Sequence, residues 1–159
     1  KLKAELNRPE SLRGTLAHVI TIPNRSFYDT FVIDGGSSVG IRVGQHVYAF
    51  GTIALGTVTA VEDQSATVQL FSAPGNTISG TASPSDIAVT LIGRGGGEYE
   101  VRIPRDVQFS IGGVIAEQST ISAVLAQIER IVTDPRDPFQ RIIAKAPVNL
   151  QALKWVIVR

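Results

Sequence analysis

Short runs of Val, Ile, Thr and Phe, broken every few residues by glycine or proline, constrain this chain more than any other feature. The stretch from Phe31 to Asp63, FVIDGGSSVGIRVGQHVYAFGTIALGTVTAVED, shows the pattern most clearly. β-Branched and aromatic residues favour strands, whereas glycine and proline mark turns. No helical period interrupts the stretch, so it predicts short antiparallel strands joined by tight turns.

The same pattern continues through most of the chain. Two or three strands are expected between His46 and Glu62. Other alternating or β-branched runs occur at Thr15–Ile22, Asp29–Asp34, Ala66–Ser72, Asp86–Gly93, Glu98–Pro104, Arg141–Val148 and Leu153–Val158. About ten short strands at regular spacing predict an all-β fold, either a barrel or a sandwich.

Two segments depart from this pattern. In STISAVLAQIERIV, the apolar residues from Ile121 to Val132 recur at helical spacing, so periodicity alone predicts a helix. Residues 1–13 are charge-dense, and Leu2 and Leu6 would share one face of a helix that Pro9 ends. The alternatives for residues 1–13 are the end of a longer helix or coiled coil, and a frayed terminus.

Composition narrows the functional classes. The formal net charge is +1, which argues against a nucleic-acid-binding protein, because such proteins normally carry a basic stripe. The chain has no cysteine and 2 histidines, so a disulfide framework is impossible and a zinc site is not expected. We predict no cofactor and no metal. A cysteine-free chain is compatible with an oxidising, extracytoplasmic compartment.

The glycines raise the question of a phosphate-binding loop. Such a loop joins a strand to a helix whose N-terminal amides face the ligand. Here the chain returns directly to strand-forming residues, and the same holds for the loop from Gly93 to Gly97. We therefore interpret the glycines as structural residues that supply positive φ at turns or form bulges. The positions assigned this role are Gly36, Gly40, Gly44, Gly51 and Gly56.

No catalytic constellation stands out. His18 and His46 are the two imidazoles, and a relay of Ser37 or Ser38 with His46 and Asp34 can be drawn on paper. No nucleophile-elbow motif supports such a relay, so polar strand residues are the better interpretation. We predict no catalytic residue and no enzymatic activity.

Two features favour protein binding. From Gln64 to Gly93 the one charged residue is Asp86, and a surface without repelling charges can associate, but buried strands with small-residue turns explain this stretch slightly better. In RSFYDTF, Phe27 and Tyr28 cluster beside a turn, and aromatic anchors are favoured at protein interfaces. We therefore predict Phe27 and Tyr28 as protein-binding residues. Phe31, inside a strand, is better explained by core packing.

The ordered motifs resemble the extracytoplasmic β-domain of the MreC family of rod shape-determining proteins. The first half carries AHVITIPNRSFYDTFVIDGGSSVGIRVGQHVYAFGTIALGTVTAVED, and the second carries GRGGGEYEVRIPRDVQFSIGGVI and DPFQRIIAKAPVNLQALKWVIV. The resemblance spans most of residues 15–158. The sequence departs from the family at EQSTISAVLAQIERI, with Ala126 where a glycine is expected. The resemblance implies a strand within 119–132, and we adopt the strand over the helix.

The resemblance implies a domain organisation. Residues 1–13 would be the end of a coiled-coil or helical linker. Residues 14–75 would form a first small β-barrel subdomain and residues 76–159 a second, with the last strand able to return to the first. Because no apolar run approaches the roughly 18 residues of a membrane span and the sequence opens at Lys1, we expect a fragment whose anchoring helix lies upstream.

The resemblance also implies partners and a location. The family acts in the cell-wall elongation machinery as a non-catalytic scaffold of peptidoglycan synthesis, at the periplasmic face of the inner membrane. The implied partners are a class B penicillin-binding transpeptidase, MreD and, indirectly, MreB, together with further copies of the chain as a homodimer or filament. Single-pass anchoring in the membrane is implied, and nucleic acid is not a partner.

Two other classes remain as alternatives. A trypsin-like double-barrel hydrolase would suit the strand count, but it needs a nucleophile, base and acid within hydrogen-bond reach. A nucleic-acid-binding barrel would need a basic, aromatic-lined groove. That groove would gather Arg94, Arg102, Arg105, Arg136, Arg141 and Lys145 on one face.

Overall fold

The computed structural model describes residues 14–21, 29–83, 86–117 and 123–159, and within them the fold is all-β, as predicted. The strands are β1 (Thr15–Thr21), β2 (Thr30–Asp34), β3 (His46–Ala49), β4 (Ile53–Val61), β5 (Ser65–Leu70), β6 (Thr77–Ala82), β7 (Ile87–Gly95), β8 (Glu98–Pro104), β9 (Val114–Glu117), β10 (Val124–Val132), β11 (Phe139–Lys145) and β12 (Trp155–Val158). Two short 3₁₀ helices, η2 (Ser37–Val39) and η3 (Leu150–Ala152), interrupt them. The helical tail expected at residues 1–13 lies outside the described residues.

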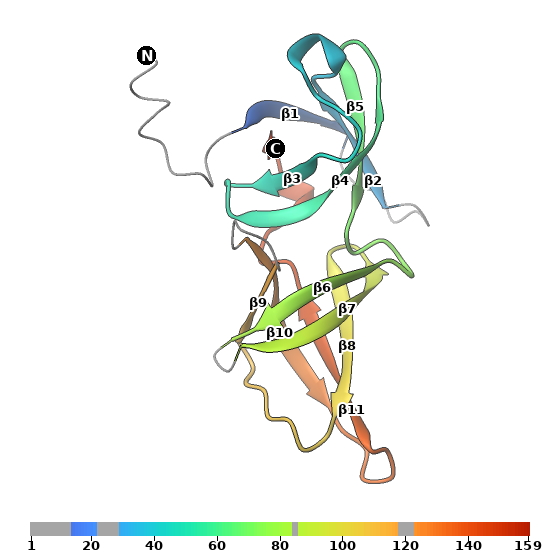
Figure 1. Ribbon diagram of the computed structural model, residues 1–159, viewed down its shortest axis with the longest axis vertical. Coiled ribbons are helices and arrows are strands. Elements are labelled where there is room, and N and C mark those ends of the chain that lie inside the picture. Colours follow the sequence, from blue (N-terminus) through green and yellow to red (C-terminus); the bar gives the residue numbers. More distant parts are fainter. Residues whose placement is uncertain (1–13, 22–28, 84–85, 118–122) are drawn as a thin grey trace.

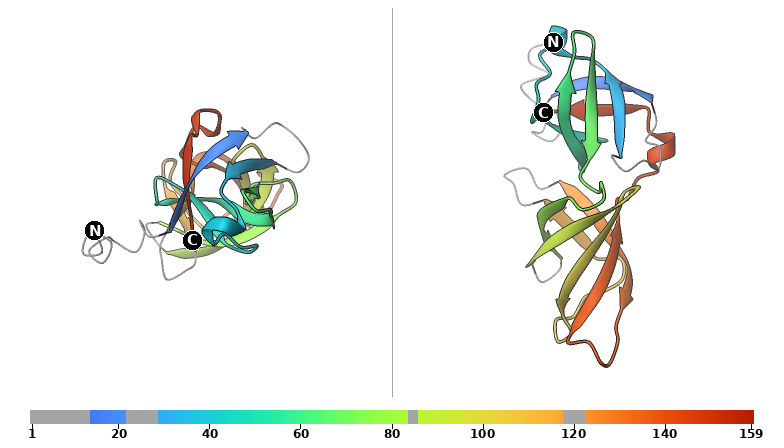
Figure 2. Two further views of the ribbon diagram at one scale, coloured as in Figure 1. Left: turned by 90° about the horizontal axis from the view of Figure 1, so that it is seen from above. Right: turned by 90° about the vertical axis from the view of Figure 1, so that its right-hand side faces the viewer.

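The strands pair into two closed rings. In the first, the order β4–β3–β12–β1–β2–β5 is closed by pairing of β5 with β4. In the second, the order β11–β8–β7–β6–β9–β10 is closed by pairing of β10 with β11. We call these rings barrel 1 and barrel 2. They lie one beyond the other along the long axis of the molecule, and the C-terminal strand β12 belongs to barrel 1 (Figures 1 and 2).

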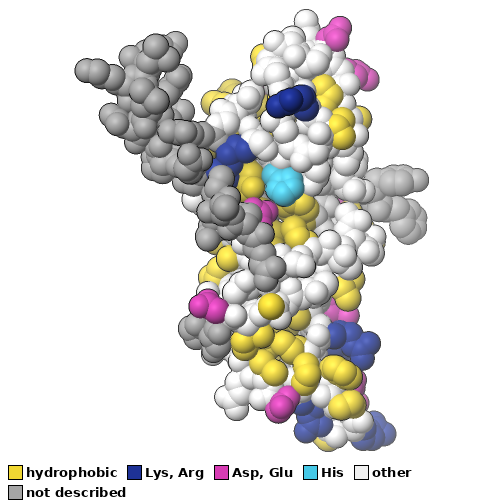
Figure 3. Space-filling model, in the orientation of Figure 1, with side chains coloured by type: hydrophobic (Ala, Val, Ile, Leu, Met, Phe, Trp, Pro, Cys, Tyr) yellow, Lys and Arg dark blue, Asp and Glu magenta, His cyan; other side chains and the backbone are white. Residues whose placement is uncertain are grey.

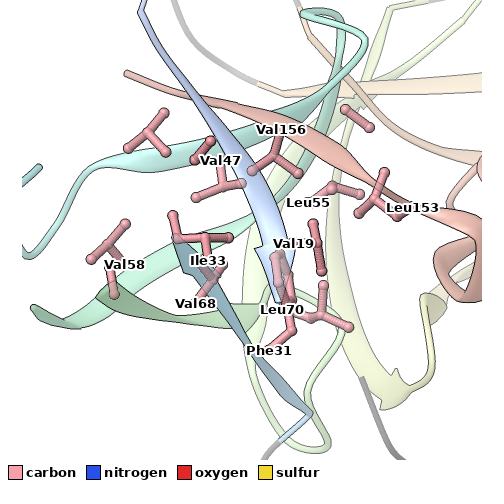
Figure 4. Packing of buried hydrophobic residues seen from close by; sticks show 14 of the residues in the cluster. Val19, Phe31, Ile33, Val47, Leu55, Val58, Val68, Leu70, Leu153 and Val156 are labelled. Atoms are coloured by element: carbon pink, nitrogen blue, oxygen red, sulfur yellow. The ribbon is translucent and has the colours of Figure 1, made fainter. Parts of the chain in front are cut away.

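The core of barrel 1 follows from strand alternation. In β5, Ala66, Val68 and Leu70 are buried, while the residues between them are half-buried. These side chains meet those of the facing strands, such as Phe31 and Val47, in one apolar cluster (Figure 4). Each fully buried side chain of this size contributes about 1.5–3 kcal/mol, so the alternation specifies which face of each strand turns inward.

Barrel 2 has its own core. Its buried residues include Leu91, Tyr99, Ile115 and Leu125, from four different strands. Tyr48 of barrel 1 also belongs to this second cluster, because its side chain points outward from β3 toward barrel 2. The two cores are therefore separate clusters that meet at the junction between the barrels.

The segment for which periodicity predicted a helix is a strand from Val124 to Val132, as the resemblance implied. Its register shifts between Val124 and Ala126 against β9, and again between Ile128 and Arg130 against β11. Each β-bulge reverses the alternation of faces, so Leu125, Ile128 and the partly buried Ile131 fall three residues apart and imitate a helical pattern. The part of the prediction on residues 119–122 lies outside the described residues.

Candidate protein-interaction surfaces

Barrel 1 exposes an apolar surface on the outward side of β1 and β12, which we call the β1–β12 face: Leu16, His18, Ile20, Trp155 and Ile157. Leu16 pairs with Ile157, and His18 pairs with Trp155. Leu16 is 62% exposed, and Ile20 and Trp155 are each 54% exposed. Large apolar side chains gathered on one face are typical of a protein-binding surface, whereas scattered ones are not.

The β1–β12 face carries almost no charge. Neither strand contains Asp, Glu, Lys or Arg. The His18 ring meets the Trp155 indole edge-on, with their centroids 4.9 Å apart. At the margin, the carboxylate of Asp34 accepts a 2.8 Å hydrogen bond from the His18 backbone N–H. A tryptophan anchor on an uncharged surface is the side-chain chemistry found at binding hot spots.

The predicted aromatic pair, Phe27 and Tyr28, lies outside the described residues. Phe31 is 1% exposed and sits in the core of barrel 1, which confirms that this aromatic residue serves packing. Next to the pair in the chain is Asp29, whose carboxylate is buried although nothing in its sequence context announces burial.

Asp29 links barrel 1 to the β7–β8 turn of barrel 2, and we call this contact the clamp. Its Oδ2 accepts a 2.6 Å hydrogen bond from the backbone N–H of Gly96. Ser72, in the segment between the barrels, holds the flanking glycines. Its carbonyl accepts from the Gly95 N–H at 2.6 Å, and its hydroxyl oxygen accepts from the Gly97 N–H at 2.9 Å. The glycine-rich turn therefore donates one backbone N–H to the chain's own Asp29 carboxylate and two to Ser72.

Burial changes the acidity of groups at this clamp. It raises the pKa of Asp29 above 3.8, and the hydrogen bond from Gly96 opposes the rise. It also raises the pKa of Tyr99, with a smaller contribution from the nearby Asp29 charge. Desolvation dominates in both cases, as expected for groups removed from water.

A second polar contact crosses the junction between the barrels. The Tyr48 hydroxyl of β3 donates a 3.1 Å hydrogen bond to Glu117 Oε1 of β9. His46 Nδ1 lies 3.7 Å from Glu117 Oε2, and the Arg159 guanidinium stacks over the Tyr48 ring at 3.9 Å. Burial raises the pKa of Tyr48, the Glu117 charge raises it further, and Arg159 opposes the rise. Sequence reasoning missed Glu117, which has no local motif.

The two imidazoles and the serines of the hypothetical hydrolytic relay make other contacts. The His18 imidazole packs against Trp155, and His46 faces Glu117 and the Phe71 ring. The backbone amides of Ser37 and Ser38 donate to the carbonyls of Glu62 and Asp63. Across the described ranges, no serine hydroxyl hydrogen-bonds to either imidazole, and no group of three His, Asp or Glu side chains could hold a metal ion.

The basic residues named for a nucleic-acid groove all lie in barrel 2, where carboxylates interleave with them. Arg94 lies 3.6 Å from Glu98 and 3.1 Å from Glu100. Arg141 lies 3.6 Å from the same Glu100. The guanidinium of Arg102 stacks on Phe139, 5.6 Å from the ring centroid. At the far tip, Arg105 donates to backbone carbonyls of the β10–β11 turn, and Arg136 lies 3.7 Å from Asp134. The arrangement is a mixed-charge surface rather than a basic groove.

The five glycines named from the sequence fall into two groups. Gly40, Gly44 and Gly51 have φ of 87°, 96° and 74°, in the left-handed region. Gly36, with φ of −141°, does not, which corrects the interpretation that it supplies positive φ. Gly56 does not either, and it lies where the register of β4 shifts against β3, a position consistent with the alternative of a bulge. At these two, an added Cβ would overlap a carbonyl oxygen of the neighbouring chain segment. They allow close backbone approach instead.

Comparison with known proteins decides the family. The family model described as "Rod shape-determining protein MreC, barrel core" matches residues 19–159. The chain belongs to the MreC family. MreC is a structural, shape-determining family, so this member is not an enzyme and the hydrolase alternative is dropped. No curated protein sequence matches the chain significantly.

Solved MreC structures share the fold. The Pseudomonas aeruginosa structure is 19% identical with a TM-score of 0.83, and the match covers 92% of this chain and 99% of that one. A structure described as the major periplasmic domain of the cell shape-determining filament MreC is 16% identical, with a TM-score of 0.64, covering 92% and 94%. MreC from a complex with penicillin-binding protein PBP2 of Helicobacter pylori is 12% identical, with a TM-score of 0.56, covering 92% and 99%.

Proposed function

We propose that this chain is a non-catalytic scaffold of the bacterial cell-wall elongation machinery, which maintains cell shape by self-associating and by binding peptidoglycan synthesis proteins. Membership of the MreC family carries the proposal. The first partner is a class B penicillin-binding transpeptidase, because MreC of H. pylori forms a complex with PBP2. MreD, and MreB indirectly, are further partners; nucleic acid is not.

The location and domain organisation follow from the same reasoning. The domain works at the periplasmic face of the inner membrane, anchored by a single N-terminal helix, as a periplasmic MreC domain of the same fold suggests. No helix among the described residues is long and apolar enough to cross a membrane. Residues 14–75 and 76–159 act as two subdomains, with the last strand, β12, returning to the first, and the separate apolar cores support this division.

Self-association uses the β1–β12 face. In a symmetric pair the same surface meets itself, so a charge near the two-fold axis would face its own copy. The near absence of charge on β1 and β12 and the exposed Leu16 and Trp155 meet this requirement. Phe27 and Tyr28 remain our proposed contacts for the transpeptidase.

A pull-down with the cognate class B penicillin-binding protein tests the proposal. The wild-type chain is expected to retain the transpeptidase, and the Phe27→Ala/Tyr28→Ala variant to retain less. Failure of the wild-type chain to bind would refute the partner. Equal binding by both chains would refute the aromatic pair as the contact and leave the partner in place.

A further inference from the structure

In barrel 2, β7 and β8 pair over part of their length, and we call the boundary between the two strands the seam. The two strands pair at Ile92–Glu100, Gly93–Tyr99 and Gly95–Glu98. Beyond these pairs they separate. Among the described residues, Ile87–Leu91 of β7 then has ladder partners in β6 only, and Val101–Pro104 of β8 in β11 only. Two strand edges therefore diverge from a common point.

Of the two edges, that of β8 is protected and that of β7 is not. Exposed strand edges are normally guarded by charged residues or proline, which discourage pairing with another chain. The β8 stretch reads VRIP, with Arg102 and with Pro104, which lacks an N–H. The β7 stretch reads IAVTL, without charge, proline or glycine. Ile87–Leu91 is thus the edge suited to accept a strand.

The direction of the backbone groups on β7 can be read from its neighbour. The Gly93 N–H donates to the Asn76 carbonyl at 2.7 Å, and the Gly93 carbonyl accepts from the Gly75 N–H at 3.1 Å. Gly93 therefore faces the β6 side. Because the facing side alternates along an antiparallel strand, Leu91 and Val89 face β6 as well. Ala88 and Thr90 then direct their N–H and C=O groups into the seam.

The surroundings of this edge are apolar, and its outward residues are exposed. Ala88 and Thr90 are exposed, and no backbone hydrogen bond links Ile87–Leu91 to the described segment 105–113. Hydrophobic side chains gather on this side of barrel 2, below β7 and beside the end of β8 (Figure 3). Val107 and Phe109 are partly buried against the core there, and Ile111 is 70% exposed.

We propose that the free edge of β7, Ile87–Leu91, binds an extended segment of the penicillin-binding partner as an added strand; this inference rests on the proposed function. An added strand forms main-chain hydrogen bonds with the edge, and every second side chain contacts the neighbouring surface. Because β7 and β8 stay paired from Ile92 to Gly95, the free edge of β7 faces β8 across the seam, and this position suits a single extended chain better than a strand that belongs to the sheet of a second copy. The occupant is therefore a single uncharged segment with alternating apolar residues.

The charge of Asp86 indicates which residue type we expect at one end of the added segment. Asp86 is exposed, directly precedes β7, and is the one charged residue between Gln64 and Gly93. A lysine or arginine at the matching end of the added strand would pair with it. Elsewhere along the edge, Ala88 and Thr90 leave room for the partner's outward side chains.

Edge variants and a matched control test this site. Thr90→Pro removes a seam-facing N–H without touching the β6 ladder, and proline is tolerated at such positions. Thr90→Lys adds the charge that guards natural edges. Ser79→Lys places the same charge on the same outer face, at the β6 residue paired with Thr90 but away from the edge. Melting temperatures within a few degrees of wild type establish that each variant is folded.

With the purified cognate class B penicillin-binding protein as probe, Thr90→Pro and Thr90→Lys are expected to raise the Kd by about tenfold or more, and Ser79→Lys to leave it unchanged. Hydrogen exchange gives a second readout: the amides of Ala88 and Thr90 should exchange quickly in the free chain and slowly in the complex. Those of Val89 and Leu91 should be slow in both.

Three results overturn the inference. Wild-type affinity in both Thr90 variants would show that the partner binds elsewhere and would leave the proposed function standing. Unchanged exchange at Ala88 and Thr90 on complex formation would do the same. Concentration-dependent dimerisation lost in Thr90→Lys, with transpeptidase binding intact, would assign the edge to a second copy. Absence of wild-type binding refutes the proposed function itself and is distinguished by the wild-type control.

Discussion

Replacing Asp29 with alanine tests whether the clamp between the barrels stabilises the fold. The substitution removes the acceptor of the 2.6 Å hydrogen bond from Gly96, a partly buried bond worth about 1–2 kcal/mol. Asp29 also has φ of 47°, and alanine is disfavoured in this left-handed region by about 1–2 kcal/mol. We expect Asp29→Ala to lower the free energy of unfolding by about 2–4 kcal/mol, measured by urea denaturation at pH 7.

Asp29→Asn is the matched control. Asparagine tolerates the left-handed conformation and keeps a side-chain oxygen that accepts from Gly96. We expect its free energy of unfolding to lie within about 1 kcal/mol of wild type. Equal stability of Asp29→Ala and wild type would refute the view that this hydrogen bond and backbone conformation stabilise the junction.

The difference in stability between wild type and Asp29→Asn should change with pH in a defined direction. Because burial raises the pKa of Asp29 above 3.8, the folded protein binds the proton more tightly than the unfolded chain. The proton-linked part of the Asp29 contribution to stability is therefore greatest below pH 3.8 and is lost as the pH rises through the folded pKa, whereas the parts from the hydrogen bond and the backbone conformation remain at pH 7. Wild-type stability relative to Asp29→Asn should fall over that range. A relative rise would contradict the desolvation account.

Three further predictions concern the glycines, the β1–β12 face and Tyr99. Gly56→Ala should cost about 1–3 kcal/mol of unfolding free energy by overlap with a neighbouring carbonyl, whereas Gly40→Asn, which has open space, should cost less than about 1 kcal/mol. Leu16→Ser/Trp155→Ser should lower the mass measured by light scattering at high concentration while the melting temperature stays near that of wild type; an unchanged mass would remove the β1–β12 face as the self-association surface. Because burial raises the pKa of Tyr99, stability should fall as the pH rises above 10, and Tyr99→Phe should reduce that loss in denaturation measurements.

Strand-forming runs in the sequence predicted most of the strands, because the alternation of apolar and polar residues and the turn-forming residues are local features of the sequence. Thr15–Thr21 and Glu98–Pro104 match their predicted runs closely. Two strands had no such signal. β6 reads TISGTA, rich in small and polar residues, and β9 reads VIAE and is four residues long. Both are specified by their pairing partners rather than by their own composition, because tertiary context decides weak strands.

The interaction surfaces were less accessible to sequence reasoning. The β1–β12 face joins Leu16 with Ile157, which lie near opposite ends of the chain, so it exists only after β12 pairs with β1. The buried carboxylates of Asp29 and Glu117 likewise depend on contacts between the two barrels. Long-range pairing of this kind leaves no periodic trace in a single sequence.

Calorimetric titration of the cognate class B penicillin-binding protein into this chain tests the scaffold role most directly. We expect saturable binding with a negative heat-capacity change, because apolar surface is removed from water on association. The absence of saturable heat at any temperature, with both proteins folded, would contradict the account.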